Sequence, residues 1–177
     1  MYFVAILVND EIATEAIRHK NFMLEQFGCK AALRSPPHVT LIPPFNMKED
    51  LRENLINSMD AFASTRIPFD FNVKDFGSFP PRVIFINVIL NDALNSLHAG
   101  LEDYMIEASQ FPIKKEARPY HPHITIATRD LDKKNFVKAW PHFSHLTFSA
   151  TQKTDAIVLL ESGKNGWKPI HSSAMKP

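Results

Sequence analysis

Residues 36–45 read P-P-H-V-T-L-I-P-P-F, and residues 118–129 read R-P-Y-H-P-H-I-T-I-A-T-R. Each segment has a histidine after a proline, followed by β-branched and aliphatic residues that are typical of a short strand. Side chains i and i+2 of a strand share one face, so His38 and Thr40 point the same way. The second segment repeats this pattern. Both segments therefore predict a strand with one face in the core and one face that presents an imidazole and a hydroxyl.

The chain around these segments follows the same order of elements twice. The first half is predicted as strand, helix, His-x-Thr strand, helix and alternating strand, at 2–8, 11–27, 38–42, 51–62 and 67–74. The second half repeats this order at 83–90, 94–108, 123–127, 130–140 (capped by Asp130) and 146–151, and a last apolar strand follows at 156–160. We therefore predict one two-lobed domain over 1–177, built from repeats at roughly 1–80 and 81–160. A pseudo-two-fold axis would make the two His-x-Thr strands face each other across a groove.

Two imidazoles and two hydroxyls that converge on a groove are suited to phosphoryl transfer. A neutral histidine can take a proton from an attacking water, and a protonated histidine can give one to a leaving oxygen. Both hydroxyls can donate to phosphoryl oxygens. We therefore predict that His38, Thr40, His123 and Thr125 are catalytic, with no metal and no other cofactor.

The tetrapeptides H-V-T-L at 38–41 and H-I-T-I at 123–126 resemble the two signatures of the two-histidine phosphoesterase superfamily. Their contexts are similar to the branch of 2′-5′ RNA ligases and RNA 2′,3′-cyclic phosphodiesterases, and the resemblance covers nearly the whole chain. It implies an α+β fold, in which two antiparallel β-sheets face a central groove with helices on the outside. It also implies that one histidine is the base, the other is the acid, and the threonines hold the phosphate. The resemblance leaves open whether the substrate is a 2′,3′-cyclic phosphate or a 2′-5′ link.

Four residues near the motifs are predicted to bind substrate: Phe45, Arg82, Tyr120 and Arg129. Arg129 has the strand parity of His123 and could bind phosphate, unless the neighbouring Asp130 pairs with it. Arg82 directly precedes the strand predicted at 83–90, and its side chain reaches either the groove or solvent. The two aromatic residues flank the motifs and either stack on a base or only pack.

The overall charge and composition limit the class of partner. Lys and Arg number 20 and Asp and Glu number 19, which gives a net charge of +1. A long nucleic-acid footprint needs clustered basic residues, so a small nucleotide or an RNA terminus is the expected partner. The five glycines form neither a P-loop nor a dinucleotide fingerprint. With one cysteine, a reducing compartment and therefore the cytoplasm is expected. No apolar stretch approaches the ~18–20 residues that span a bilayer, so we expect no membrane contact. The repeat arrangement gives no reason to expect dimerisation, so we expect a monomer.

Two other functions stay open from the sequence. A nucleotide-binding module without turnover would use the same groove, although both motifs are intact. A metal-dependent hydrolase would use His121 and His123, whose spacing on a strand suits a metal ion. Pro122 between them and the lack of a nearby carboxylate cluster count against this alternative.

Overall fold

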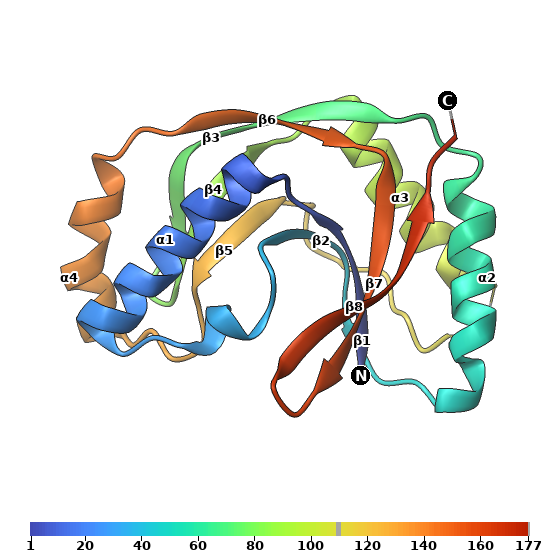
Figure 1. The fold of residues 1–177 in the computed structure, drawn as a ribbon, viewed down its shortest axis with the longest axis horizontal. Coiled ribbons are helices and arrows are strands. Elements are labelled where there is room, and N and C mark those ends of the chain that lie inside the picture. The colour runs from blue at the N-terminus through green and yellow to red at the C-terminus, as the bar shows by residue number, and fades with distance from the viewer. Residues whose placement is uncertain (109–110, 177) are drawn as a thin grey trace.

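The computed structural model describes residues 1–108 and 111–176, and in them the chain forms two four-stranded sheets and four α-helices (Figure 1). The strands are β1 (Tyr2–Leu7), β2 (His38–Phe45), β3 (Phe69–Phe79), β4 (Val83–Ile89), β5 (His123–Ala127), β6 (Ser149–Thr154), β7 (Ala156–Gly163) and β8 (Gly166–Ala174). The helices are α1 (Asp10–Phe27), α2 (Arg52–Ala63), α3 (Asp92–Glu107) and α4 (Lys133–Ser144), with 3₁₀ turns η1 (Ala31–Arg34) and η2 (Glu49–Leu51). The α+β prediction is confirmed.

Each sheet takes strands from both halves of the chain. One sheet has the order β2-β1-β7-β8, and the other has the order β5-β4-β3-β6. All neighbouring strands are antiparallel, as expected. The late strand β3 of the first half pairs with β4, and β7 of the second half pairs with β1. The sheets therefore do not coincide with the predicted repeats, because the halves exchange their last strands.

The helices lie on the outside of this pair of sheets. In Figure 1, α1 and α4 lie at one end beside β3 and β5, whereas α2 and α3 lie at the other end beside β7, β8 and β2. The strands with the motifs, β2 and β5, are the edge strands of their sheets and contact each other in the middle of the molecule. This is the predicted arrangement, with helices outside and the His-x-Thr strands facing each other.

The helices α1, α3 and α4 each begin after a residue whose side chain accepts a hydrogen bond from a free backbone N–H group of the first turn. Asn9 and Asn91 cap α1 and α3, and each side chain accepts from the amide three residues later, at 3.1 and 2.9 Å. For α4 the predicted cap was wrong, because Asp132 and not Asp130 accepts from the amide of Asn135, at 2.7 Å. The carboxylate of Asp130 is engaged elsewhere, near the site described below.

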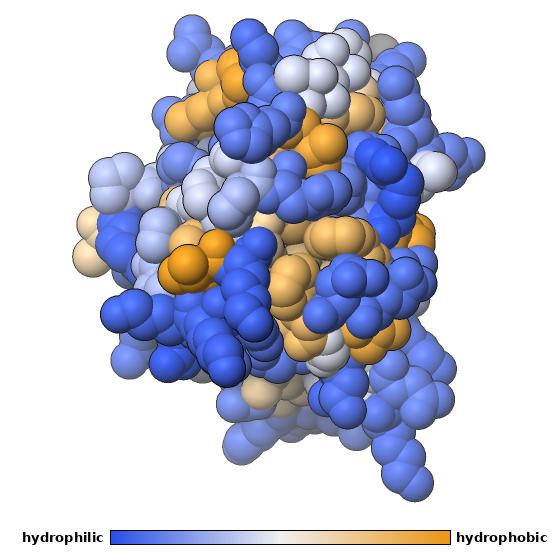
Figure 2. All heavy atoms as spheres, turned by 90° about the vertical axis from the view of Figure 1, so that its left-hand side faces the viewer, coloured by the Kyte–Doolittle hydropathy of each residue, from blue (hydrophilic) through white to orange (hydrophobic). Residues whose placement is uncertain are grey.

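The outer face over α1 and α4 is mostly hydrophilic, and Figure 2 shows apolar groups scattered among polar ones on it. The exposed apolar side chains of these helices are Ile17, Leu24 and Val137. Within residues 1–108 and 111–176, no helix combines the length and the apolar character needed to cross a bilayer.

Candidate active site

The four motif side chains come from the adjoining strands β2 and β5. His38, Thr40, His123 and Thr125 are all half-buried. The residues between them, Val39 and Ile124, are fully buried in the core. Burial thus alternates along both strands with the phase that the sequence predicts, and the polar side chains of each strand share one face.

Each motif histidine is held by the backbone carbonyl two residues earlier. Nδ1 of His38 lies 2.7 Å from the oxygen of Pro36, and Nδ1 of His123 lies 2.8 Å from the oxygen of His121. A carbonyl oxygen can only accept, so Nδ1 carries a proton in both rings. Nε2 is therefore the nitrogen that is left to accept a proton when the ring is neutral, or to donate one when it is charged.

A phenylalanine supports each of these rings from the neighbouring strand. The centroids of Phe3 and His38 lie 4.8 Å apart, and those of Phe85 and His123 lie 4.9 Å apart. Phe3 on β1 and Phe85 on β4 have the same position in the two halves, and both are buried. The repeat therefore holds the two imidazoles by equivalent backbone and aromatic contacts.

The surroundings lower the pKa of both histidines. Burial lowers the pKa of His38 to about 4, and the nearby charges of Lys20 and His123 add to this, although the hydrogen bond to Pro36 opposes it. Burial also lowers the pKa of His123, against the hydrogen bond to His121. His38 is therefore neutral over the whole neutral range of pH.

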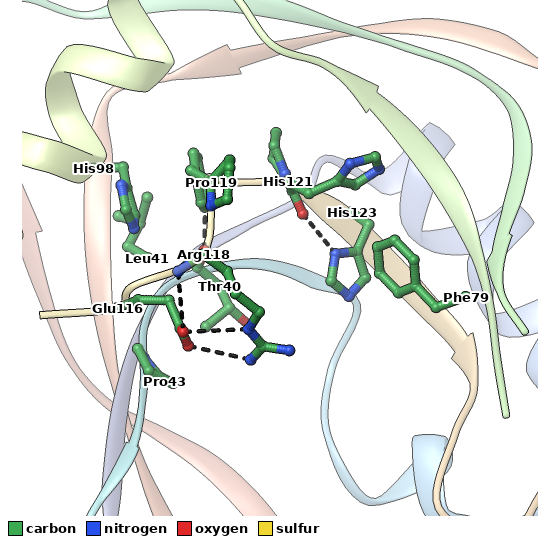
Figure 3. Close-up of a pocket in the computed structure, with 12 residues that line it drawn as sticks. Thr40, Leu41, Pro43, Phe79, His98, Glu116, Arg118, Pro119, His121 and His123 are labelled. Atoms are coloured by element: carbon green, nitrogen blue, oxygen red, sulfur yellow. Dashed lines mark hydrogen bonds and ion pairs between the residues drawn. The ribbon is translucent and has the colours of Figure 1, made fainter.

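A cavity of about 520 Å³ lies on the His123 side of the site, and we call it the His123 cavity. Its wall is mostly apolar or aromatic and includes Leu41, Pro43, Phe79, Pro119, Tyr120 and Pro122. In Figure 3, His123 and Phe79 lie at one side of the cavity, and the ion pair of Arg118 with Glu116, at 3.2 Å, lies at the other. An apolar cleft with a few polar groups is suited to hold a nucleobase.

A second cavity of about 470 Å³ lies on the His38 side, and we call it the His38 cavity. Its polar lining includes Arg34, His38, Thr40, Thr125, Thr128 and Arg129. Thr40 lines both cavities, so they adjoin at this residue. Thr40 thus shares one cavity with His123 and the other with His38.

Arg129 does not pair with its neighbour Asp130. One oxygen of Asp130 accepts from the backbone amides of Lys30 and Ala31, at 2.7 and 2.8 Å, at the start of η1. Across the described ranges, no ion pair is formed by Arg129, which has a positive φ of 56° and lines the His38 cavity. Its guanidinium is therefore available to an anion, as the sequence-based prediction requires.

Tyr120 lines the His123 cavity and is tied to the first motif. Its hydroxyl donates to the backbone oxygen of Thr40 at 3.0 Å, and burial raises its pKa. Its ring stacks on His98, with centroids 3.7 Å apart and planes 6° apart. The helical pattern of the sequence marks His98 only as a core or boundary residue, and its place in the cavity was not foreseen.

The other two predicted substrate-binding residues lie outside both cavities. Phe45 is buried against Tyr2, with ring centroids 6.3 Å apart, and lines a separate hollow near the end of β2. Arg82 is exposed in the turn between β3 and β4. Their role in binding stays a prediction.

Trp167 is the main cavity residue that sequence reasoning missed. It lies on β8, a strand that was not predicted, and lines the His38 cavity. Asn165-Gly166 is a typical hairpin signal and could have revealed β8.

Among residues 1–108 and 111–176, no group of three or more His, Cys, Asp or Glu could hold a metal ion.

Comparisons with known proteins agree with this architecture. The chain is 27% identical over 140 residues to a protein of Bacillus thuringiensis (strain Al Hakam) named "Putative phosphoesterase", and the match covers 78% of this chain and 77% of that protein. The structure is similar to TT0787 of Thermus thermophilus, with a TM-score of 0.75 and 20% identity over 98% of this chain and 97% of that one. It is also similar to E. coli LigT complexed with 3′-AMP (TM-score 0.72, 20% identity, 99% and 98% covered) and with NADP⁺ (0.62, 18%, 99% and 97%).

These structures share the fold of two antiparallel sheets with outer helices, over almost the full length of each chain. The sequence pattern of one family, described as the 2′-5′ RNA ligase superfamily, matches residues 8–166. Because this match spans both motifs and most of the sequence, the chain belongs to the 2′-5′ RNA ligase superfamily of two-histidine phosphoesterases.

Proposed function

We propose that this protein is a phosphodiesterase that opens 2′,3′-cyclic phosphates on RNA ends or small nucleotides, or cleaves 2′-5′ phosphodiester links. The observation that carries the proposal is the pair of imidazoles on adjoining strands, each with Nδ1 held by a carbonyl and Nε2 left for proton transfer. Paired histidines in opposite protonation states provide general base and general acid catalysis. The proposed reaction involves no metal and no other cofactor, and because both motifs come from one chain, a monomer suffices.

The different surroundings of the two rings favour His38 as the base and His123 as the acid. A base must be neutral, and His38 has its pKa lowered to about 4. In ring opening, Nε2 of His38 takes a proton from water as the water oxygen bonds to phosphorus. The bond from phosphorus to one ribose oxygen then breaks, and that oxygen receives the proton on Nε2 of His123. Exchange of protons with solvent restores both rings before the next turnover.

The negative charge that develops on phosphorus needs donors close to it. The hydroxyls of Thr40 and Thr125 share the strand faces of the two histidines, and Arg129 lines the same cavity. We propose that these groups stabilise the equatorial oxygens of the pentacoordinate transition state. The apolar wall of the His123 cavity, with Tyr120, would hold the base of the terminal nucleotide.

A similar fold binds nucleotides in another protein. LigT of E. coli is known in complexes with 3′-AMP and with NADP⁺, and both ligands are nucleotides. This supports the choice of nucleotides as the first substrates to test.

The test uses a short RNA that ends in a 2′,3′-cyclic phosphate, incubated in EDTA with wild type, His38→Ala and His123→Ala. We expect ring opening by wild type and a loss of about 10²–10⁴-fold in each variant. His145→Ala, which removes an exposed histidine outside both cavities, serves as the matched control, and Arg82→Ala separately tests the predicted role of that arginine. Separation of 2′- and 3′-phosphate products shows which ribose oxygen leaves.

Two outcomes would contradict the proposal. Activity that disappears in EDTA would contradict catalysis by histidines alone. Tight binding of 3′-AMP with no turnover of any cyclic phosphate or 2′-5′ link would instead identify a nucleotide-binding module on the same fold.

A further inference from the structure

We propose that the His38 cavity is a second nucleotide subsite, in which Trp167 stacks on a base and Arg34 binds the phosphodiester that joins two nucleotides. This rests on the proposed function, and it narrows the substrate class from mononucleotides to oligonucleotide ends. An RNA that ends in a cyclic phosphate has a neighbour only on its 5′ side. The subsite would therefore hold the penultimate nucleotide, while the terminal base occupies the His123 cavity.

The wall of this cavity is built by two segments that pack backbone against backbone. Gly166, at the tip of the hairpin formed by β7 and β8, has a φ of 118°, and a Cβ there would collide with the carbonyl oxygen of Arg34. Only glycine permits this close approach. The contact fixes Trp167, the next residue, beside the end of η1, where Arg34 lies. The main chain thus places Trp167 and Arg34 in the lining of the same cavity.

A row of rings connects this wall to the motif. The centroids of Trp167 and Phe3 lie 4.7 Å apart in an edge-to-face contact, and those of Phe3 and His38 lie 4.8 Å apart. The indole is half-buried and lines the cavity. It therefore lies two ring contacts from His38 and can offer a surface to the neighbouring base. Stacking of a base on an aromatic side chain tolerates any sequence, because every base has a π-face.

The His38 cavity carries more positive charge than a bound cyclic phosphate would neutralise. Arg34 and Arg129 both line it, and among the described residues neither forms an ion pair. Behind the wall, the buried Lys20 donates to the oxygen of Ser35, another lining residue, at 3.1 Å. A cyclic phosphate carries a single negative charge. A second phosphate, one nucleotide away, would supply the missing counter-charge for Arg34.

The first experiment compares kcat/KM for 2′,3′-cyclic AMP, for its 5′-phosphorylated form, and for the dinucleotide ApA ending in a 2′,3′-cyclic phosphate. We expect wild type to prefer the dinucleotide over cyclic AMP by at least about tenfold. Arg34→Gln should lose about tenfold on both substrates with a second phosphate, and Trp167→Ala should lose about tenfold or more on the dinucleotide alone. Both variants should keep wild-type activity on 2′,3′-cyclic AMP. Lys168→Gln, which removes an exposed charge from the same strand outside the cavity, is the matched control.

A binding measurement separates this proposal from the proposed chemistry. The protein has two tryptophans, Trp140 and Trp167, so Trp140→Phe makes Trp167 the sole indole fluorophore. In that background, ApA with a 3′-phosphate should quench fluorescence and bind more tightly than 3′-AMP. Arg34→Gln should abolish the difference and should lower the slope of log affinity against log salt by about 0.7, the value for one phosphate contact on a single strand.

The outcomes lead to distinct conclusions. If no substrate is turned over but ApA with a 3′-phosphate binds more tightly through Arg34, the subsite is supported and the proposed phosphodiesterase activity is contradicted. Equal binding of the two ligands, insensitive to Arg34→Gln, overturns the subsite whether or not the enzyme is active. Loss of activity on 2′,3′-cyclic AMP in both variants also overturns it, because these residues would then serve the terminal nucleotide.

Discussion

In the first half of the molecule, Nζ of Lys20 on α1 donates to the backbone oxygen of Ser35 at 3.1 Å. In the second half, the carboxylate of Glu102 on α3 accepts from the backbone amide of Glu116 at 2.9 Å. Lys20 and Glu102 are buried and have the same position relative to the capping residue of their helices. Each holds the segment that leads into its motif strand, but with opposite charge.

This difference shows how a duplicated fold can make two equal histidines unequal. The two rings share backbone and aromatic contacts, so local geometry does not distinguish a base from an acid. The charge of Lys20 adds to burial in lowering the pKa of His38. In the His123 cavity, burial lowers the pKa of His98, but the charge of Glu102 opposes this shift. We therefore expect the charges around the two rings, and not the motifs themselves, to separate their proposed roles.

The largest effect should come from a substrate that needs no acid. On a nucleoside 3′-(p-nitrophenyl phosphate), the weakly basic leaving group departs without a proton. The 2′-hydroxyl attacks phosphorus in this ester in the reverse sense of ring opening, so His123 would take the proton of the 2′-hydroxyl and His38 would face the leaving group. We therefore expect His38→Ala to lose about 10²–10⁴-fold on a 2′,3′-cyclic phosphate but less than about tenfold on this ester, whereas His123→Ala loses activity on both. Absorbance of p-nitrophenolate and resolved product ends give the two rates. Equal losses in the two variants on both substrates would show that the comparison does not separate base from acid.

The next effect concerns the free energy of unfolding. Burial lowers the pKa of Lys20 to about 8 from an ordinary 10.5. Between these two values the unfolded state binds more protons than the folded state, so stability rises with pH, by about 3 kcal/mol. Lys20→Met removes a buried cation that, in the described residues, has no carboxylate partner, and should abolish this rise.

Urea midpoints of both proteins from pH 7 to 10.5 measure this effect. Lys48→Met, at an exposed lysine, is the matched control and should keep the wild-type pH dependence. If Lys20→Met lowers stability by several kcal/mol at pH 7, the hydrogen bond to Ser35 outweighs the penalty of burial, and the argument from charge is wrong.

Lys20→Met should also shift the pH dependence of kcat/KM. In the proposed mechanism His38 is the base and must be neutral, so kcat/KM should rise as pH increases through about 4, the pKa of His38. The acid His123 must be protonated, so kcat/KM should fall as pH increases through a value below 6.5. Lys20→Met removes a charge that disfavours protonated His38, and should shift the ascending limb to higher pH. Glu102→Gln, which keeps an acceptor for Glu116, should leave that limb in place; a shift of equal size in both variants would contradict the comparison.

The local parts of this site were readable from the sequence, because they depend on short periods. The alternation of His38, Val39 and Thr40 fixes which side chains share a face, and Asn9 and Asn91 mark helix starts. The pairing of β3 with β4 and of β7 with β1 could not be predicted from the sequence, because pairing between distant strands leaves no local signal. The strand β8 was missed because it contains Pro169 and little alternation. Lys20 resembles any charged residue of a surface helix, and only packing shows that it is buried.

The smallest effect should come from Tyr120→Phe, because this substitution removes only the hydrogen bond between Tyr120 in the second half of the chain and Thr40 in the first. The substitution removes the hydroxyl that donates to the oxygen of Thr40, and should cost about 1 kcal/mol of stability, measured by urea unfolding. The ring still stacks on His98, so KM for a cyclic phosphate should change less than about threefold. Tyr104→Phe, at a partly exposed tyrosine of α3, controls for loss of a hydroxyl. An increase in KM above tenfold with unchanged stability would mean that the hydroxyl of Tyr120 binds substrate, and that the His123 cavity takes part in recognition through a polar group as well as through its apolar wall.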